Sequence, residues 1–428
     1  MKYKKIATQT YNLHIIKTKK FKTVTIEVNF KNKLDKEEIT YRNLLINTLC
    51  SSTKSYPNKR YMEIATEDLY ELNYGATNYV SGKYNVMSYD ITFLNEKYTE
   101  TGMFDKSVDF LCEMLFNPNT EDKRNYTRFN TKSFNIAYDK LCDSIKSIKD
   151  DPAYYSKLRL LELMCPNNMI SYRPCGYMED LKKVNAKKLY EYYKKMIKSD
   201  IIDVFVIGDV NEAHVKKIIS DKFRVRTIKK QSDSHFISSK RTRLIPKTVV
   251  EKQNISQSKL AIGAKLDKTS DFERRYVMNV YSYILGGGPD SKLFKTVREE
   301  NSLCYSISSA GQPLQNLLTI SAGINAKDFK RTVSLIKKEI KNMQHGNFTD
   351  DDIIKAKVTY INSIKELEDS PQSIISLYAG MEYLDSDDIE TRIKMINKVT
   401  KKSVVKLAKK VHLDLIYLLE GVDKDEKV

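Results

Sequence analysis

The chain has 428 residues, which allows two or three domains and an ample hydrophobic core. Its hydrophobic content of 41% and charged content of 30% describe an ordinary soluble globular protein, and no apolar run is long enough to cross a membrane. The net charge of +18 would suit an anionic partner such as nucleic acid or a membrane surface, but the basic residues are scattered along the whole chain, which favours a general compositional bias.

The first half of the chain mixes strand-like and helical patterns. Tyr11 to Lys17 and Lys22 to Lys31 have the alternation of paired strands, and Gly75 opens a segment of two more strands. Helical periodicity predicts helices over residues 35–50, 58–73, 103–116, 122–149 and 185–198. The apolar run IIDVFVIGDV, residues 201–210, predicts a central buried strand.

Residues 225–249 are polar, basic and without hydrophobic period, which is typical of a linker. The pattern of the first half then repeats. Strands are predicted over 258–266, 303–311, 316–324 and 413–422, and helices over 271–285, 291–300, 329–343, 349–368 and 401–411.

The repeat predicts a duplicated domain. Residues 180–210 and 392–422 both read as turn, helix, apolar strand and glycine, and the blocks upstream of them match in order. Because strands and helices alternate irregularly and hairpins are present, the class is α+β, with a mixed sheet packed with helices in each copy. The predicted domains are 1–224 and 250–428, joined by the linker 225–249.

The cysteines and the N-terminus predict a cytoplasmic protein. The chain has six cysteines, none of them in a CxxC pair, which is typical of free thiols in a reducing compartment rather than a disulfide scaffold or zinc ribbon. The start MKYKK is not followed by a continuous apolar stretch, so it does not have the pattern of a signal peptide.

The stretch from Leu285 to Ile307 is the most punctuated of the chain. A helical run ends at the glycines 286–288, which predict a helix C-terminus with close backbone approach rather than a phosphate-binding loop, because the lysine context of such a loop is absent. Arg298 and Tyr305 are the candidate functional residues. A guanidinium presents a fixed fork of donors to a carbonyl, and a phenol can stabilise an oxyanion. The structural alternative is that Arg298 pairs with a neighbouring glutamate and that Tyr305 packs.

The duplicated unit and the sequence SKLFKTVREENSLCYSISS, residues 291–309, resemble the pitrilysin (insulinase) family of zinc peptidases over nearly the whole chain. The segment LCSSTKSYP, residues 49–57, with Glu251-Lys252-Gln253, is similar to a non-catalytic, YfmF-like bacterial branch of that family. The resemblance implies a pitrilysin/LuxS-like metallohydrolase fold. It also implies that Arg298 and Tyr305 match a pair that reaches a substrate at the family's zinc site.

Active members of the family carry HxxEH on the first long helix, where two imidazoles bind zinc and the glutamate activates water. The matching positions here are Asn43, Ile46 and Asn47, and no glutamate occurs between Glu121 and Glu162 to supply the third ligand. We therefore expect no metal, no cofactor and no catalytic residue in this chain alone.

The resulting hypothesis is a zinc-less subunit of a heterodimeric peptidase that processes peptides. A homologous partner would bear the zinc, and this chain would donate the substrate-binding Arg298 and Tyr305. Neither nucleic acid nor a membrane span is expected. The alternative is a non-enzymatic peptide-binding or scaffold protein with a degenerate peptidase fold.

Overall fold

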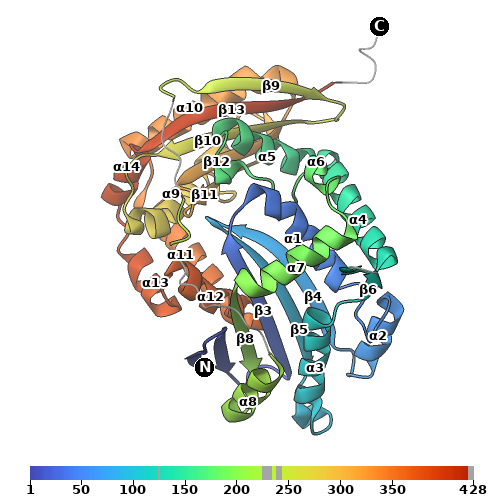
Figure 1. The fold of residues 1–428 in the computed structure, drawn as a ribbon. Helices are drawn as coiled ribbons and strands as arrows, with labels where there is room; N and C mark the ends of the chain where they lie inside the picture. The colour runs from blue at the N-terminus through green and yellow to red at the C-terminus, as the bar shows by residue number, and fades with distance from the viewer. Residues whose placement is uncertain (124–125, 224–233, 238–242, 423–428) are drawn as a thin grey trace. The chain divides into compact units, whose positions relative to one another are not determined.

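The computed structural model describes residues 1–123, 126–223, 234–237 and 243–422 (Figure 1). It divides into two compact units, each with its own sheet. Unit 1 comprises residues 1–146, 173–235 and 369–383, and unit 2 comprises residues 147–172, 236–368 and 384–428. Among the residues described, no helix is long and apolar enough to span a bilayer.

Unit 1 is built on a six-stranded sheet of order β1-β2-β8-β3-β5-β4. Its strands are β1 Lys2–Ala7, β2 Asn12–Lys17, β3 Thr23–Lys33, β4 Asn73–Ser81, β5 Tyr84–Leu94 and β8 Ile201–Gly208. A separate hairpin is formed by β6 Thr120–Lys123 and β7 Tyr126–Phe129. The helices are α1 Lys36–Leu49, α2 Lys59–Glu67, α3 Met103–Phe116, α4 Thr131–Lys146, α6 Met178–Leu181, α7 Ala186–Ser199, α8 Glu212–Lys222 and α12 Pro371–Leu384.

Unit 2 is built on a five-stranded sheet of order β11-β12-β10-β13-β9. Its strands are β9 Lys247–Gln253, β10 Ser258–Leu266, β11 Cys304–Gln312, β12 Leu317–Ile324 and β13 Val411–Gly421. The helices are α5 Pro152–Met164, α9 Met278–Gly286, α10 Phe329–His345, α11 Asp350–Glu366, α13 Ile389–Asn397 and α14 Lys401–Ala408. Two π-helical segments, Glu273–Val277 and Phe294–Glu299, precede α9 and β11.

The predicted α+β duplication is confirmed by strand order and direction. In unit 1, β2 runs parallel to β8, which is followed by antiparallel β3, β5 and β4. In unit 2, β9 runs parallel to β13, which is followed by antiparallel β10, β12 and β11. The same five-strand pattern therefore occurs twice, and β1 is an addition at one edge of the first copy.

Each compact unit contains segments from both halves of the chain, whereas the sequence predicts one domain on either side of a single linker. Residues 147–172 belong to unit 2, where α5 packs through Leu160 and Met164 on β10 and β13. Residues 369–383 belong to unit 1, where Tyr378 of α12 stacks on Tyr3 and Tyr383 contacts Phe205. The apolar residues of each of these helices are buried against the sheet of the other half of the sequence. Of the predicted linker, 247–249 form the start of β9, and 225–233 and 238–242 lie outside the described residues.

Two local predictions are wrong. The strands predicted over 11–17 and 22–31, which the structure has as β2 and β3, do not pair with each other, because the strongly apolar β8 lies between them in the sheet. The helix predicted over 122–149 starts only at Thr131. Before it, Glu121 on β6 and Arg128 on β7 form an ion pair 3.0 Å long, and Phe129 is buried against Tyr193. These contacts hold the segment as a hairpin.

A buried histidine of unit 1, His235, packs against residues of β4, β5 and α12. His235 is 1% exposed; its Nδ1 lies 3.0 Å from Ser81 Oγ, and its ring stacks on Tyr84 and Tyr383. Burial, and then the positive charge of Lys31, lower the pKa of His235 from 6.5 to about 4. The folded chain therefore keeps this imidazole neutral in acid where the unfolded chain would protonate it.

We expect unit 1 to lose stability in acid through His235. The unfolded chain binds a proton at this histidine more readily than the folded chain does. The free energy of unfolding is therefore at its full value, as far as His235 is concerned, above about pH 6.5, and it decreases as the pH falls toward 4. His235→Phe keeps an aromatic ring at this site without a titrating group. Its melting temperature should fall less than that of the parent between about pH 7 and about pH 4 in a calorimetric series. Parallel pH profiles of the two proteins would contradict this expectation.

Candidate functional site

The helix that would carry a metal motif is α1. It begins at Lys36 with Asp35 as its N-cap, whose side chain accepts from the Glu37 amide. Arg42 fixes the helix from within the core: its guanidinium is 1% exposed, pairs with Asp200 and donates to the Phe30 carbonyl at 3.3 Å. These buried contacts therefore hold α1 in place over the sheet.

The three positions of the degenerate motif carry neither an imidazole nor a carboxylate, the groups that bind zinc in this family's motif. Asn43 Nδ2 donates to the carbonyls of Ile39 and Pro174 at 2.9 and 2.8 Å, and Asn47 Nδ2 donates to the Asn43 carbonyl at 3.0 Å. Ile46 is buried. The amides thus serve the local backbone, and an aliphatic side chain occupies the position of a general base.

The neighbouring helix supplies no further ligand. α4 packs against α1, and its buried residues are Ser133, Phe134, Ala137, Leu141 and Ile145. In the described part of the chain, no three His, Cys, Asp or Glu residues cluster in a way that could hold a metal ion. The residues at this place do not fit the zinc of active peptidases, which needs a complete set of nitrogen, sulfur or carboxylate ligands.

The structure brings Arg298 and Tyr305 together in unit 2. Arg298 is the last residue but one of the π-helical segment Phe294–Glu299, and its guanidinium carbon lies 4.5 Å from the Phe294 ring centroid and 5.3 Å from that of Tyr305. The expected structural alternative, an ion pair with Glu299 or Glu300, is not found among the described residues. The guanidinium is instead held between two aromatic faces, a cation–π arrangement that leaves its N–H donors available.

Tyr305 is aimed outward by a β-bulge. On the edge strand β11, Cys304 pairs with Ile324 and Ser306 with Gly323, so Tyr305 is an extra residue opposite β12. Its side chain is 77% exposed, whereas Ile307 beyond it is buried. Bulges re-aim side chains and are frequent beside functional sites, as are π-helical turns. Simple alternation from Leu303 would place Tyr305 on the buried face, so sequence reasoning could not supply this geometry.

The glycine run has the structural role that the sequence predicts. α9 ends at Gly286, and Gly287 is its C-cap. A Cβ on Gly286 would lie 2.7 Å from the Ser309 backbone nitrogen on β11, so the absence of a side chain lets the helix end approach this strand. A Cβ on Gly288 would meet nothing nearer than 3.8 Å.

These two glycines give a matched pair of variants. Gly286→Ala should destabilise the protein by about 1–3 kcal/mol, because helix and strand must separate to admit the methyl group. Gly288→Ala should change the stability by less than about 0.5 kcal/mol. Thermal unfolding of both variants measures the difference, and equal melting temperatures would show that the close approach is not needed.

Comparison with known proteins agrees with this fold. Residues 183–360 match the family model described as the peptidase M16 inactive domain. The chain is 30% identical over 417 residues to "Probable inactive metalloprotease YmfF" of Bacillus subtilis, covering 96% of each protein. A conserved protein from Enterococcus faecalis is 26% identical, with a TM-score of 0.92 over 99% of this chain and 100% of that structure. A Pseudomonas fluorescens structure described as a peptidase M16 inactive domain has a TM-score of 0.77 at 14% identity, over 99% of each chain.

Proposed function

Since this chain belongs to the peptidase M16 family, the pitrilysin or insulinase family, and is an inactive, metalloprotease-like member of it, we propose that it is the non-catalytic subunit of a two-chain peptidase. A homologous subunit with an intact HxxEH motif would bear the zinc. This chain would contribute Arg298 and Tyr305 to the peptide bound there.

The observation that carries the proposal is the asymmetry between the two candidate sites. At the three motif positions α1 carries two amides and an aliphatic side chain, so it presents no set of zinc ligands. Arg298 and Tyr305 lie in contact, and the phenol is exposed on an edge strand. A guanidinium and a phenol can bind the carbonyl and the developing oxyanion of a peptide, but they provide no nucleophile and no metal. For hydrolysis, the pair would therefore need a second protein that supplies both.

Purification of the tagged chain from its native host tests the assembly. We expect a homologous subunit of similar length to co-purify and the complex to contain zinc that is absent from this chain alone. Recovery of the chain without any homologous subunit, in a form that still binds peptides, would favour the scaffold alternative.

A further inference from the structure

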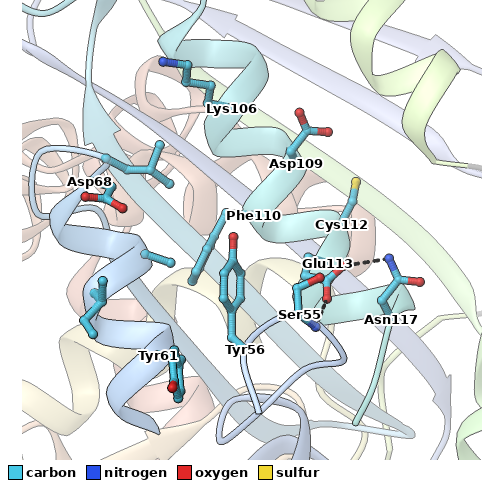
Figure 2. A pocket seen from close by; sticks show the side chains of 13 residues that line it. Ser55, Tyr56, Tyr61, Asp68, Lys106, Asp109, Phe110, Cys112, Glu113 and Asn117 are labelled. Atoms are coloured by element: carbon cyan, nitrogen blue, oxygen red, sulfur yellow. Dashed lines mark hydrogen bonds between the residues drawn. The ribbon is translucent and has the colours of Figure 1, made fainter. Parts of the chain in front are cut away.

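A groove of about 660 Å³ lies between α2 and α3 in unit 1 (Figure 2). Its floor is apolar. Phe110 is 2% exposed and packs against Tyr56, with the two ring centroids 5.8 Å apart (Figure 2). Its α2 side presents two large side chains to solvent, Tyr61 at 51% and Ile64 at 42% exposure. The groove therefore offers apolar surface that no described part of the chain covers.

The rim of this groove is acidic, although the whole chain has a net charge of +18. Three carboxylates line it, those of Asp68, Asp109 and Glu113, and the one basic residue of the lining, Lys106, forms an ion pair with Glu100. Asp109 pairs with Lys222, whereas Asp68 is exposed and forms no ion pair within the described residues.

Hydrogen bonds keep one of these carboxylates ionised. Burial opposes the charge on Glu113, but the Ser55 amide and the Asn117 side chain, each 2.8 Å away, outweigh it and hold the pKa of Glu113 below its ordinary value. Burial raises the pKa of Tyr56 most, and the negative charges of the three carboxylates raise it further. The three carboxylates thus lie close enough to Tyr56 to disfavour a second negative charge there.

The chain immediately after α2 is strained. Tyr70 and Glu71 both have a φ of 57°, a left-handed conformation that non-glycine residues rarely adopt and that is unusual twice in succession. The turn is closed by the Leu72 amide, which donates to the Thr66 carbonyl at 3.1 Å, and it leaves Tyr70 48% exposed. Strain of this kind persists where the surrounding structure enforces it and is concentrated at binding sites.

We propose that the α2–α3 groove binds a cationic amphipathic segment of a partner protein. Lysine or arginine side chains would face Asp68 and Glu113, and aliphatic side chains would cover Tyr61 and Ile64. The acidic rim would repel nucleic acid and an anionic membrane surface. The apolar floor distinguishes such a segment from a small polycation, which has no side chain to bury there. This binding does not depend on the proposed peptidase role.

Fluorescence anisotropy with two labelled synthetic helical peptides tests the proposal on the full-length chain. Both peptides carry leucine on one face; one carries arginine and the other glutamate on the opposite face. We expect the arginine peptide to bind. Asp68→Lys and Ile64→Ser should each weaken its binding at least about tenfold. Asp139→Lys is the matched control, because it makes the same charge change at an exposed position of α4 outside the groove, and its affinity should equal that of the parent.

Several outcomes would overturn the assignment. Equal weakening by Asp139→Lys would mean that only the general charge matters. Displacement of the peptide by spermine, with no effect of Ile64→Ser, would identify a polycation site instead. Self-association in sedimentation experiments that Asp68→Lys abolishes would make a second copy of this chain the occupant. Absence of binding by the arginine peptide, with the variant proteins folded, would end the proposal.

Discussion

Arg298→Ala should lower kcat/KM of the two-chain complex by about 100-fold or more, the size of effect seen when one fixed donor to a developing oxyanion is removed. The substitution should lower the rate of hydrolysis and leave the fold of the variant intact. Arg298 makes no ion pair in the described part of the chain, and its contacts are the faces of Phe294 and Tyr305. Steady-state hydrolysis of a fluorogenic peptide by the purified complex measures the effect.

Two conservative variants define the origin of this loss. Arg298→Lys keeps the charge but not the planar fork, so it should recover only part of the activity. Tyr305→Phe keeps the ring beneath the guanidinium and removes the hydroxyl, so it separates the chemistry of the phenol from its packing. Tyr98→Phe is a control at another exposed tyrosine, 55% exposed in unit 1, and should have no effect. An unchanged kcat/KM for Arg298→Ala would show that this residue does not reach the substrate.

Arg42→Ala should cost about 3–5 kcal/mol of stability, the largest effect we expect from a single substitution in unit 1. Arg42 and Asp200 are each nearly inaccessible, with side chains 1% exposed. Burial raises the pKa of Asp200, and the neighbouring guanidinium opposes that rise. Removal of Arg42 would leave a buried carboxylate without its cation, and α1 would lose its connection to the residue that precedes β8.

The matched comparisons use the same unit. Arg42→Met combined with Asp200→Leu removes both charges and should restore much of the stability, because no buried charge remains unpaired. Lys183→Ala breaks the ion pair of Lys183 with Asp180, which is 2.9 Å long and has a lysine 68% exposed, and it should leave the melting temperature close to that of the parent. Calorimetric unfolding of the set measures the differences. A melting temperature of Arg42→Ala equal to that of Lys183→Ala would contradict the account.

Periodicity predicted the elements that are long and regular. The alternation of 23–33 and the apolar run at 201–208 gave β3 and β8, and the repeat of these patterns predicted the duplication that the two sheets share. Periodicity could not predict the order of the strands in the sheet, because a buried strand such as β8 can lie between two strands that precede it in sequence. Nor could it assign α5 and α12 to their units, since an apolar helix face does not specify which sheet will cover it.

The candidate site was predicted by residue type, but its geometry was not. Arg298 and Tyr305 were named from sequence, and their contact depends on a π-helical turn and a one-residue bulge that hydrophobic spacing does not encode. The α2–α3 groove was missed altogether. Its carboxylates come from residue 68, the C-cap of α2, and from residues 109 and 113 of α3. The β4–β5 hairpin separates the two helices in sequence, and only the packing of α2 beside α3 collects these residues.

The most direct test of the central claim is a mixing experiment. This chain, the zinc-bearing homologue and an equimolar mixture of both are assayed at equal concentrations for hydrolysis of the same fluorogenic peptide, with zinc measured in each sample. The account predicts turnover and zinc in the mixture, zinc in the homologue, and neither in this chain alone. Hydrolysis by this chain alone, or a mixture no more active than the homologue, would contradict it.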